Sequence, residues 1–304
     1  MKKVGFIGLG TMGLPMAKHL IDTGYETFVV SRSRGPIEEA ISYGAKEAKT
    51  PKQLMETCDI VMTCLPVPKT IEDVYEGEDG LIAGASPGKV VIDHSTVDRQ
   101  TNERVQALLR EKGTGFMDAP VSGGPMGAVA GSLTIMCGGE EQTFMLAEPV
   151  MKSYGAYIVH VGPIGSGTVI KLLNNMLIGV HQAALAECYV MAEKAGVDPA
   201  IAYDLIQKSA GFSKSMDWAV DAILDREFDA RFSINLLDKD IGLALELANE
   251  INMPLDMVKL GAEKVALAKE KYGHQDVSAI VRPLEEKTGV ILKRHTKEKI
   301  KPRI

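Results

Sequence analysis

The sequence near the start of the chain reads Lys3-Val-Gly-Phe-Ile-Gly8-Leu-Gly10-Thr-Met-Gly13. Its apolar residues before Gly8 predict a short strand, and apolar residues three to four apart predict a helix over residues 11–23. A Gly-x-Gly-x-x-Gly pattern between a strand and a helix is typical of the turn that holds the pyrophosphate of a dinucleotide, because glycines admit the phosphates and the helix N-terminus offers unpaired N–H groups. A glycine-rich turn without a ligand is the alternative. We expect a cofactor-binding turn made of Gly8, Leu9, Gly10, Thr11, Met12 and Gly13.

Strand and helix patterns alternate through the first half of the chain. Apolar strands are expected at residues 26–31, 59–64, 89–93, 115–118, 133–137 and 157–161, with a short strand near 46–49. The segments between them include helical patterns at residues 36–43, 51–57 and 99–112. Nearly continuous apolar strands between helices are typical of a mostly parallel, doubly wound sheet. The sequence therefore predicts an α/β Rossmann domain over residues 1–164.

The second strand ends in Ser31-Arg32-Ser33-Arg34. Rossmann domains that bind NAD carry an acidic residue here for the ribose 2′-hydroxyl, and an arginine accommodates the 2′-phosphate of NADP. Without a carboxylate to repel that phosphate, Ser31, Arg32 and Ser33 favour NADP(H). In the alternative, the arginines are solvated and NAD(H) binds through the two serine hydroxyls.

Polar or turn residues follow three further strands, where ligands of such sheets bind. Leu65, Pro66 and Thr96 are expected to line the cofactor, although Thr96 could also cap the next helix. Asp118-Ala-Pro-Val-Ser122-Gly123-Gly124-Pro-Met-Gly127 predicts a loop whose backbone N–H groups and serine hydroxyl could hold a carboxylate. The alternative for this loop is a mobile connection.

The stretch Gly165-Ser-Gly-Thr-Val-Ile-Lys171-Leu-Leu-Asn174-Asn175 opens a long apolar helix over residues 165–195. Lys171 and Asn175 are one turn apart, so they share a helix face with Asn174 beside them. These residues either cap a helix end or lie at a solvated rim, or they converge on a polar ligand. Because apolar residues surround most of this helix, we expect its burial by its own domain or by another subunit, in a homodimer or homotetramer.

The remaining sequence is all helical. Helices are expected at residues 199–209, 215–225, 234–252, 254–272 and 276–288, and Asp198 precedes a proline as a helix cap. The chain thus reads as a Rossmann domain, a long interdomain helix, an all-α C-terminal domain over residues 196–291, and a basic, solvated tail over residues 292–304. Lys239 and Asp240 interrupt one apolar helix, where a solvated face is the ordinary interpretation.

Composition limits the function classes. The chain has 304 residues, 24% of them charged, and a net charge of −6, which argues against binding to nucleic acid or an anionic membrane. Its 4 cysteines lack metal spacing with histidine, so we expect reduced thiols, no metal and a cytoplasmic location. The N-terminal apolar run is glycine-punctuated, unlike a signal peptide, and the long helix carries too many polar residues for a membrane span.

Four ordered motifs resemble the β-hydroxyacid dehydrogenase family: GFIGLGTMG, DAPVSGG, GxGxxxKLLNN and LLDKD. That family includes 3-hydroxyisobutyrate dehydrogenase, tartronate semialdehyde reductase and the glyoxylate/succinic semialdehyde reductases. The resemblance extends from about Lys3 to Val290 and implies reversible hydride transfer between a nicotinamide and a small acid. This sequence departs from the family pattern at Ser31-Arg32-Ser33 and at His94. His94 stands where a smaller residue is commoner.

The resemblance also implies roles for individual residues. Lys171 would be the catalytic lysine and Asn175 its partner amide. Thr96 would lie by the nicotinamide and Lys239 by the cofactor. The substrate would be held by the carboxylate loop and by pocket residues, which are Ser122, Gly123, Gly124, Asn174, Phe232 and Asp240.

These expectations combine into one function. We expect an NADP(H)-dependent oxidoreductase that interconverts a small β-hydroxyacid and its semialdehyde, with Lys171 as general acid and base. The alternative substrates are glyoxylate, succinic semialdehyde and sulfonated aldehydes. A protein that binds NADP(H) without turnover is an alternative of another class, and Lys171 argues against a third alternative, an imine reductase.

Overall fold

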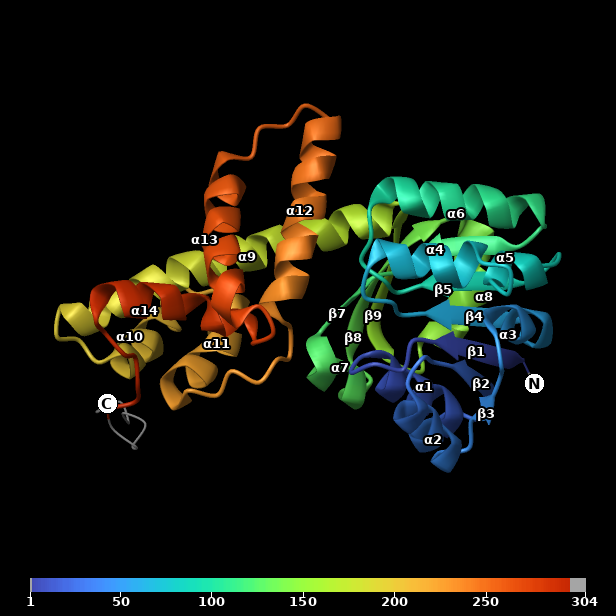
Figure 1. The fold of residues 1–304 in the computed structure, drawn as a ribbon, viewed down its shortest axis with the longest axis horizontal. Coiled ribbons are helices and arrows are strands. Elements are labelled where there is room, and N and C mark those ends of the chain that lie inside the picture. The colour runs from blue at the N-terminus through green and yellow to red at the C-terminus, as the bar shows by residue number, and fades with distance from the viewer. Residues whose placement is uncertain (1, 296–304) are drawn as a thin grey trace. The chain divides into compact units, whose positions relative to one another are not determined.

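The computed structural model describes residues 2–295, and Figure 1 traces their fold. The chain divides into two compact units, Met1–Leu172 and Leu173–Ile304, and the long helix α9 begins in the first and continues in the second.

The first unit is built on one mixed, mostly parallel sheet. Its strands are β1 (Lys3–Ile7), β2 (Glu26–Val30), β3 (Lys46–Glu47), β4 (Ile60–Thr63), β5 (Val90–Asp93), β6 (Gly115–Asp118), β7 (Val121–Ser122), β8 (Leu133–Gly139) and β9 (Gly155–Gly162). The order is β3-β2-β1-β4-β5-β6-β8-β7, and β9 pairs with β8. Strands β1 to β6 run parallel, and β8 is antiparallel to β6 and β7. The carboxyl ends of the parallel strands therefore share one edge.

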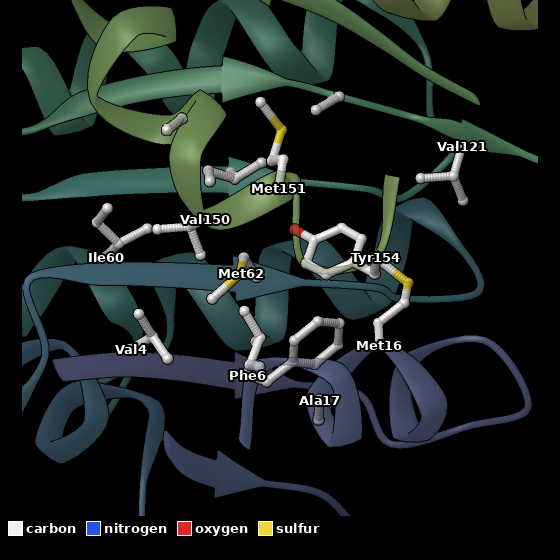
Figure 2. Close-up of a cluster of buried hydrophobic side chains, with 14 of the residues drawn as sticks. Val4, Phe6, Met16, Ala17, Ile60, Met62, Val121, Val150, Met151 and Tyr154 are labelled. Atoms are coloured by element: carbon white, nitrogen blue, oxygen red, sulfur yellow. The ribbon is translucent and has the colours of Figure 1, made fainter. Parts of the chain in front are cut away.

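Helices cover both faces of this sheet (Figure 1). They are α1 (Gly13–Asp22), α2 (Arg34–Ser42), α3 (Pro51–Thr57), α4 (Pro68–Glu76), α5 (Leu81–Gly84), α6 (Arg99–Glu111), α7 (Gly124–Ala130) and α8 (Glu141–Met151). Since successive strand side chains alternate between faces, Phe6 and Met62 join a core with Met16 (Figure 2), whereas Val61 packs with Leu54 on the other face. The predicted Rossmann architecture is confirmed.

The second unit is helical. It contains most of α9 (Ser166–Lys194), then α10 (Pro199–Ile206), α11 (Lys214–Asp225), α12 (Ile234–Glu250), α13 (Asp256–Tyr272), a 3-10 helix (Val277–Val281) and α14 (Arg282–Thr288). Its core includes Tyr189, Ile223, Leu237 and Val265. By length and composition α9 could cross a membrane, yet 33% of its most apolar window is buried in the structure.

Several expectations need correction. Helices α4 and α5 are not among the predicted elements, and the helix expected over residues 276–288 is a 3-10 helix followed by α14. The expected loop ends at Gly124, where α7 begins, and the His19 ring nitrogen holds the last carbonyls of α7 at 3.1 and 3.0 Å. A contact from a distant helix is invisible in local sequence patterns.

The expected solvated tail is also wrong for its first residues. Leu292 is fully buried, and its N–H donates to Glu285 at 2.8 Å. Arg294 pairs with Asp221 and Asp225 of α11 at 2.7 and 3.0 Å. Acidic partners on another helix hold this segment, and the rest of the tail lies outside the described residues.

Candidate active site

The glycine turn connects β1 to α1. A Cβ on Gly13 would lie 1.9 Å from the Gly8 carbonyl oxygen, so the close approach of turn and helix excludes any side chain there. A Cβ on Gly10 would meet nothing within 4 Å. Helix α1 has no side-chain cap and no acidic residue in its first turn. The turn thus fits a pyrophosphate, which would receive hydrogen bonds from this open helix end.

The two arginines that follow β2 have different surroundings, because Arg34 is the first residue of α2 and Arg32 precedes the helix. Arg34 donates to Glu38 at 3.0 Å and to Glu47 at 2.8 Å, so its charge is neutralised within the chain. Arg32 is exposed and, within residues 2–295, makes no hydrogen bond or ion pair. Ser33 is the N-cap of α2, yet its side chain makes no capping bond. A guanidinium and a hydroxyl are therefore accessible beside Ser31.

A buried hydrogen-bond network joins the ends of β4 and β5. Asp93 accepts from Thr63 at 2.7 Å and from the Ser95 hydroxyl at 2.5 Å, and that hydroxyl accepts from the Leu65 N–H at 2.8 Å. The network holds the backbone of Leu65 against Ser95, the residue before Thr96, while Pro66 is exposed. Sequence reasoning missed this role, although an aspartate at a strand end was a visible signal. Asp98 caps α6, so the alternative of Thr96 as its cap is wrong.

His94 has a packing role. It is buried, and its ring nitrogens lie 2.7 Å from the Ala119 carbonyl and 2.8 Å from the Tyr154 hydroxyl. Burial lowers the pKa of His94 to about 4, so the ring is neutral near pH 7.

Ser122, Gly123 and Gly124 join β7 to α7. Ser122 pairs with Thr134 through the backbone, and its hydroxyl makes no hydrogen bond to the part of the chain that the structure describes. Gly123 is the N-cap of α7 and provides no side-chain cap. A free hydroxyl and open N–H groups are the features expected of a carboxylate site.

The first turn of α9 is anchored to the end of β6. Asp118 accepts from the N–H groups of Gly165 and Thr168, both at 2.7 Å. Lys171 follows and is half-buried. Burial and, to a smaller extent, Asp93 raise the pKa of the Cys64 thiol to about 12, and Lys171 opposes this rise. The ammonium therefore lies within electrostatic reach of the carboxyl end of β4.

The second unit contains a polar cluster among apolar helices. The Asn175 amide donates to Asp240 at 2.6 Å and accepts from Asn174 at 2.9 Å. The Lys239 ammonium forms an ion pair with Asp240 at 2.7 Å. Asn175 and Asp240 are buried, so a solvated face is the wrong interpretation here.

Phe232 is half-buried against the helical core.

Among the described residues, no group of three or more His, Cys, Asp or Glu side chains could hold a metal ion. All four cysteines are free thiols.

A model of the NAD binding domain of 6-phosphogluconate dehydrogenase matches residues 3–162. A model of the NAD-binding domain of NADP-dependent 3-hydroxyisobutyrate dehydrogenase matches residues 165–284. The chain is 36% identical over 290 residues to 2-(hydroxymethyl)glutarate dehydrogenase of Eubacterium barkeri, with 95% of this chain and 96% of that protein covered. The chain belongs to the β-hydroxyacid dehydrogenase family.

Other members of the β-hydroxyacid dehydrogenase family extend the likeness. 2-Hydroxy-3-oxopropionate reductase of Escherichia coli is 33% identical, with 93% of this chain and 97% of that one covered. The structure of 3-hydroxyisobutyrate dehydrogenase of Mycobacterium tuberculosis with L-serine superposes with a TM-score of 0.86 at 30% identity, covering 93% of this chain and 99% of that one. This chain is therefore an NAD(P)-dependent oxidoreductase of that family.

Proposed function

We propose that this enzyme interconverts a small β-hydroxyacid and its semialdehyde, with NADP(H) preferred. The single observation that carries the proposal is the placement of Lys171, which lies on a helix anchored by Asp118 and within electrostatic reach of Cys64 at the end of β4. The bound nicotinamide would supply or accept the hydride. The relatives named for hydroxyacids and oxoacids support the substrate class.

In this proposal Lys171 is the general acid and the general base. In the reducing direction its ammonium donates a hydrogen bond to the substrate carbonyl oxygen and then a proton to the alkoxide; in oxidation it accepts the proton from the hydroxyl. Asn175 lies one turn further along α9, and its amide is held by Asp240 and Asn174. Such a fixed amide orients its neighbours without rearranging during the reaction, which lowers the barrier.

The remaining residues hold the two ligands. Ser122, Gly123 and Gly124 bind the substrate carboxylate, and Phe232 with Asp240 bounds the pocket. Residues 8–13, Leu65, Pro66, Thr96 and Lys239 bind the cofactor.

Arg32 supports the preference for NADP(H). It pairs with no described residue, whereas Arg34 is occupied by Glu38 and Glu47. A guanidinium matches the geometry of a phosphate through parallel hydrogen bonds, so we assign Arg32 to the 2′-phosphate, flanked by Ser31 and Ser33. Replacing Arg32 with Ser should raise KM for NADPH about tenfold and leave KM for NADH little changed, at ~1.4 kcal/mol for one such pair. A preference for NADH in the unmodified enzyme would contradict this assignment.

An oligomer is part of the proposal. On α9, Leu173, Leu177 and Met191 are 43%, 49% and 70% exposed. A row of exposed apolar side chains on one long helix favours coverage by a second copy, in a homodimer or homotetramer. Light scattering of the purified enzyme tests this. We also expect a cytoplasmic enzyme, because its free cysteines suit a reducing compartment.

The decisive experiment measures NADPH oxidation with methylmalonate, tartronate and succinic semialdehydes, glyoxylate and a sulfonated aldehyde, with NADH in parallel. Lys171→Ala should lower kcat by about 10³-fold or more, within the range for loss of a proton-transfer group. Lys269→Ala serves as a control. Lys269 lies on the surface of α13, and its ammonium forms an ion pair with Asp238 of α12. NADPH binding without turnover of any substrate would favour the non-catalytic alternative. Full activity of Lys171→Ala would remove this lysine from the mechanism.

A further inference from the structure

The carboxylate of Asp118 connects three elements of the first unit. It lies at the end of β6, is 1% exposed, and accepts from the Gly165 and Thr168 N–H groups at the start of α9. The Thr168 hydroxyl also hydrogen-bonds to it, and the Asn102 amide of α6 donates to that hydroxyl at 2.8 Å. Asn102 and Thr168 are themselves buried.

Close packing at Gly167 holds the same turn of α9 in place. A Cβ on Gly167 would lie 2.2 Å from the Met136 carbonyl oxygen of β8 and 2.9 Å from Asp118. The first turn of α9 therefore presses against backbone atoms of the sheet, with no side chain between them. The turn is held at the end of the sheet, because Asp118 binds two of its N–H groups and backbone atoms of β8 leave no room for a side chain at Gly167.

Lys171 lies three residues after Thr168, within one helical turn of this anchorage. A shift of the first turn would carry Lys171 with it, since the intervening residues are all helical. A misplacement of about 1 Å in a catalytic group can cost about 10²-fold in rate.

We infer that Asp118 is a positioning residue, which sets the place of the Lys171 ammonium by capping α9. The inference rests on the proposed role of Lys171. Asp118 touches neither ligand in this role; it acts through the backbone of α9. Four residues later in the same segment comes Ser122, so one short stretch would hold the catalytic helix and lead into the carboxylate loop.

The test compares Asp118→Asn with Gly167→Ala. The first variant puts an NH₂ group against a backbone N–H. The second keeps the carboxylate and pushes the same turn away from the Met136 carbonyl oxygen and from Asp118. Each should lower kcat by about 10- to 100-fold, while KM for NADPH stays within about twofold and NADPH fluorescence titration gives one site per chain. Asp198→Asn is the control, because Asp198 caps α10, with its carboxylate 2.8 Å from the Ala200 N–H. It should lose stability without this loss of kcat.

A second readout separates positioning from general structural damage. In enzyme that already carries Lys171→Ala, adding Asp118→Asn should lower the residual rate by less than about twofold, because no ammonium remains to be placed. An equal loss in both backgrounds would overturn the inference, as would a normal kcat in both Asp118→Asn and Gly167→Ala. If Asp118→Asn fails to fold, Gly167→Ala decides by the same readouts. Failure of the proposed function looks different: the unmodified enzyme then lacks turnover, or its turnover is independent of Lys171.

Discussion

Helices α1 and α9 both begin in the first unit after glycine-rich turns, and their first turns differ in how their N–H groups are satisfied. At α1 there is no side-chain cap and no acidic residue, and Gly10 faces open space. At α9 the Asp118 carboxylate already accepts two of the N–H groups. Both turns pack closely, since Gly13 and Gly167 each have a backbone oxygen where a Cβ would be.

The difference shows what makes a glycine turn an anion site. A helix N-terminus attracts negative charge in either case. At α9 the chain supplies that charge, so the turn fixes a helix. At α1 the charge must come from a ligand, and the open turn is suited to bind a cofactor phosphate.

The largest effect expected from this comparison concerns Gly13. Replacing it with Ala would place a methyl group 1.9 Å from the Gly8 carbonyl oxygen, so β1 and α1 must separate. The free energy of unfolding should fall by about 3 kcal/mol, the upper range for overpacking of a core. Urea unfolding of the cofactor-free enzyme measures it. An unchanged transition midpoint would show that the turn yields easily and that close packing does not explain this glycine.

A smaller effect follows from pH, because an anion that belongs to the chain can be protonated. Burial raises the pKa of Asp118 to about 6 from 3.8, so the folded enzyme gains a proton as pH falls through 6 while the unfolded chain does not. This contribution is fully present below pH 3.8 and is lost as pH rises through 6. Between pH 7 and 5 the unfolding free energy should therefore rise by about 1 kcal/mol from Asp118.

His94 acts in the opposite direction and provides the matched comparison. Its pKa falls to about 4 from 6.5, so between these values the unfolded chain binds the proton and the folded enzyme does not. Stability from His94 is present above pH 6.5 and declines as pH falls, by about 2 kcal/mol between pH 7 and 5. Relative to the unmodified enzyme, His94→Gln should thus lose less stability on acidification and Asp118→Asn should lose more. Parallel pH profiles of urea unfolding for the three proteins would contradict both assignments.

The smallest effect on stability concerns Gly10, and this variant sharpens the comparison most. Because a Cβ there would meet nothing, Gly10→Ala should leave the thermal midpoint of the cofactor-free enzyme nearly unchanged. A bound pyrophosphate would need that space, so Kd for NADPH should rise about tenfold, or ~1.4 kcal/mol. Fluorescence titration with NADPH gives the affinity. Unaltered binding would mean that the phosphates lie elsewhere.

Much of the fold followed from local patterns. The strands of the first unit alternate with helices in the sequence, and β1, α1, β2, β5 and β6 appear close to where apolar periodicity placed them. The glycine pattern, the lysine of α9 and the LLDKD motif were also visible, because each is a short run with its own chemistry. Helices α4 and α7 were not predicted, because α4 follows a proline-rich turn and α7 is short and rich in glycine and alanine.

Tertiary structure alone decided which buried polar residues form hydrogen bonds with one another. Periodicity gives the face on which a residue lies, and it cannot say which distant group meets it. That Asp118 caps α9, that Asp93 binds Thr63, and that Asp240 holds Asn175 depend on contacts between residues 30 to 65 positions apart. The sequence by itself determined a dinucleotide-binding sheet and a lysine-bearing helix, because strand and helix periods and glycine spacing are local properties. The pairing of buried carboxylates with their donors was settled only by folding, because a buried charge must find whatever partners the packed chain brings within reach.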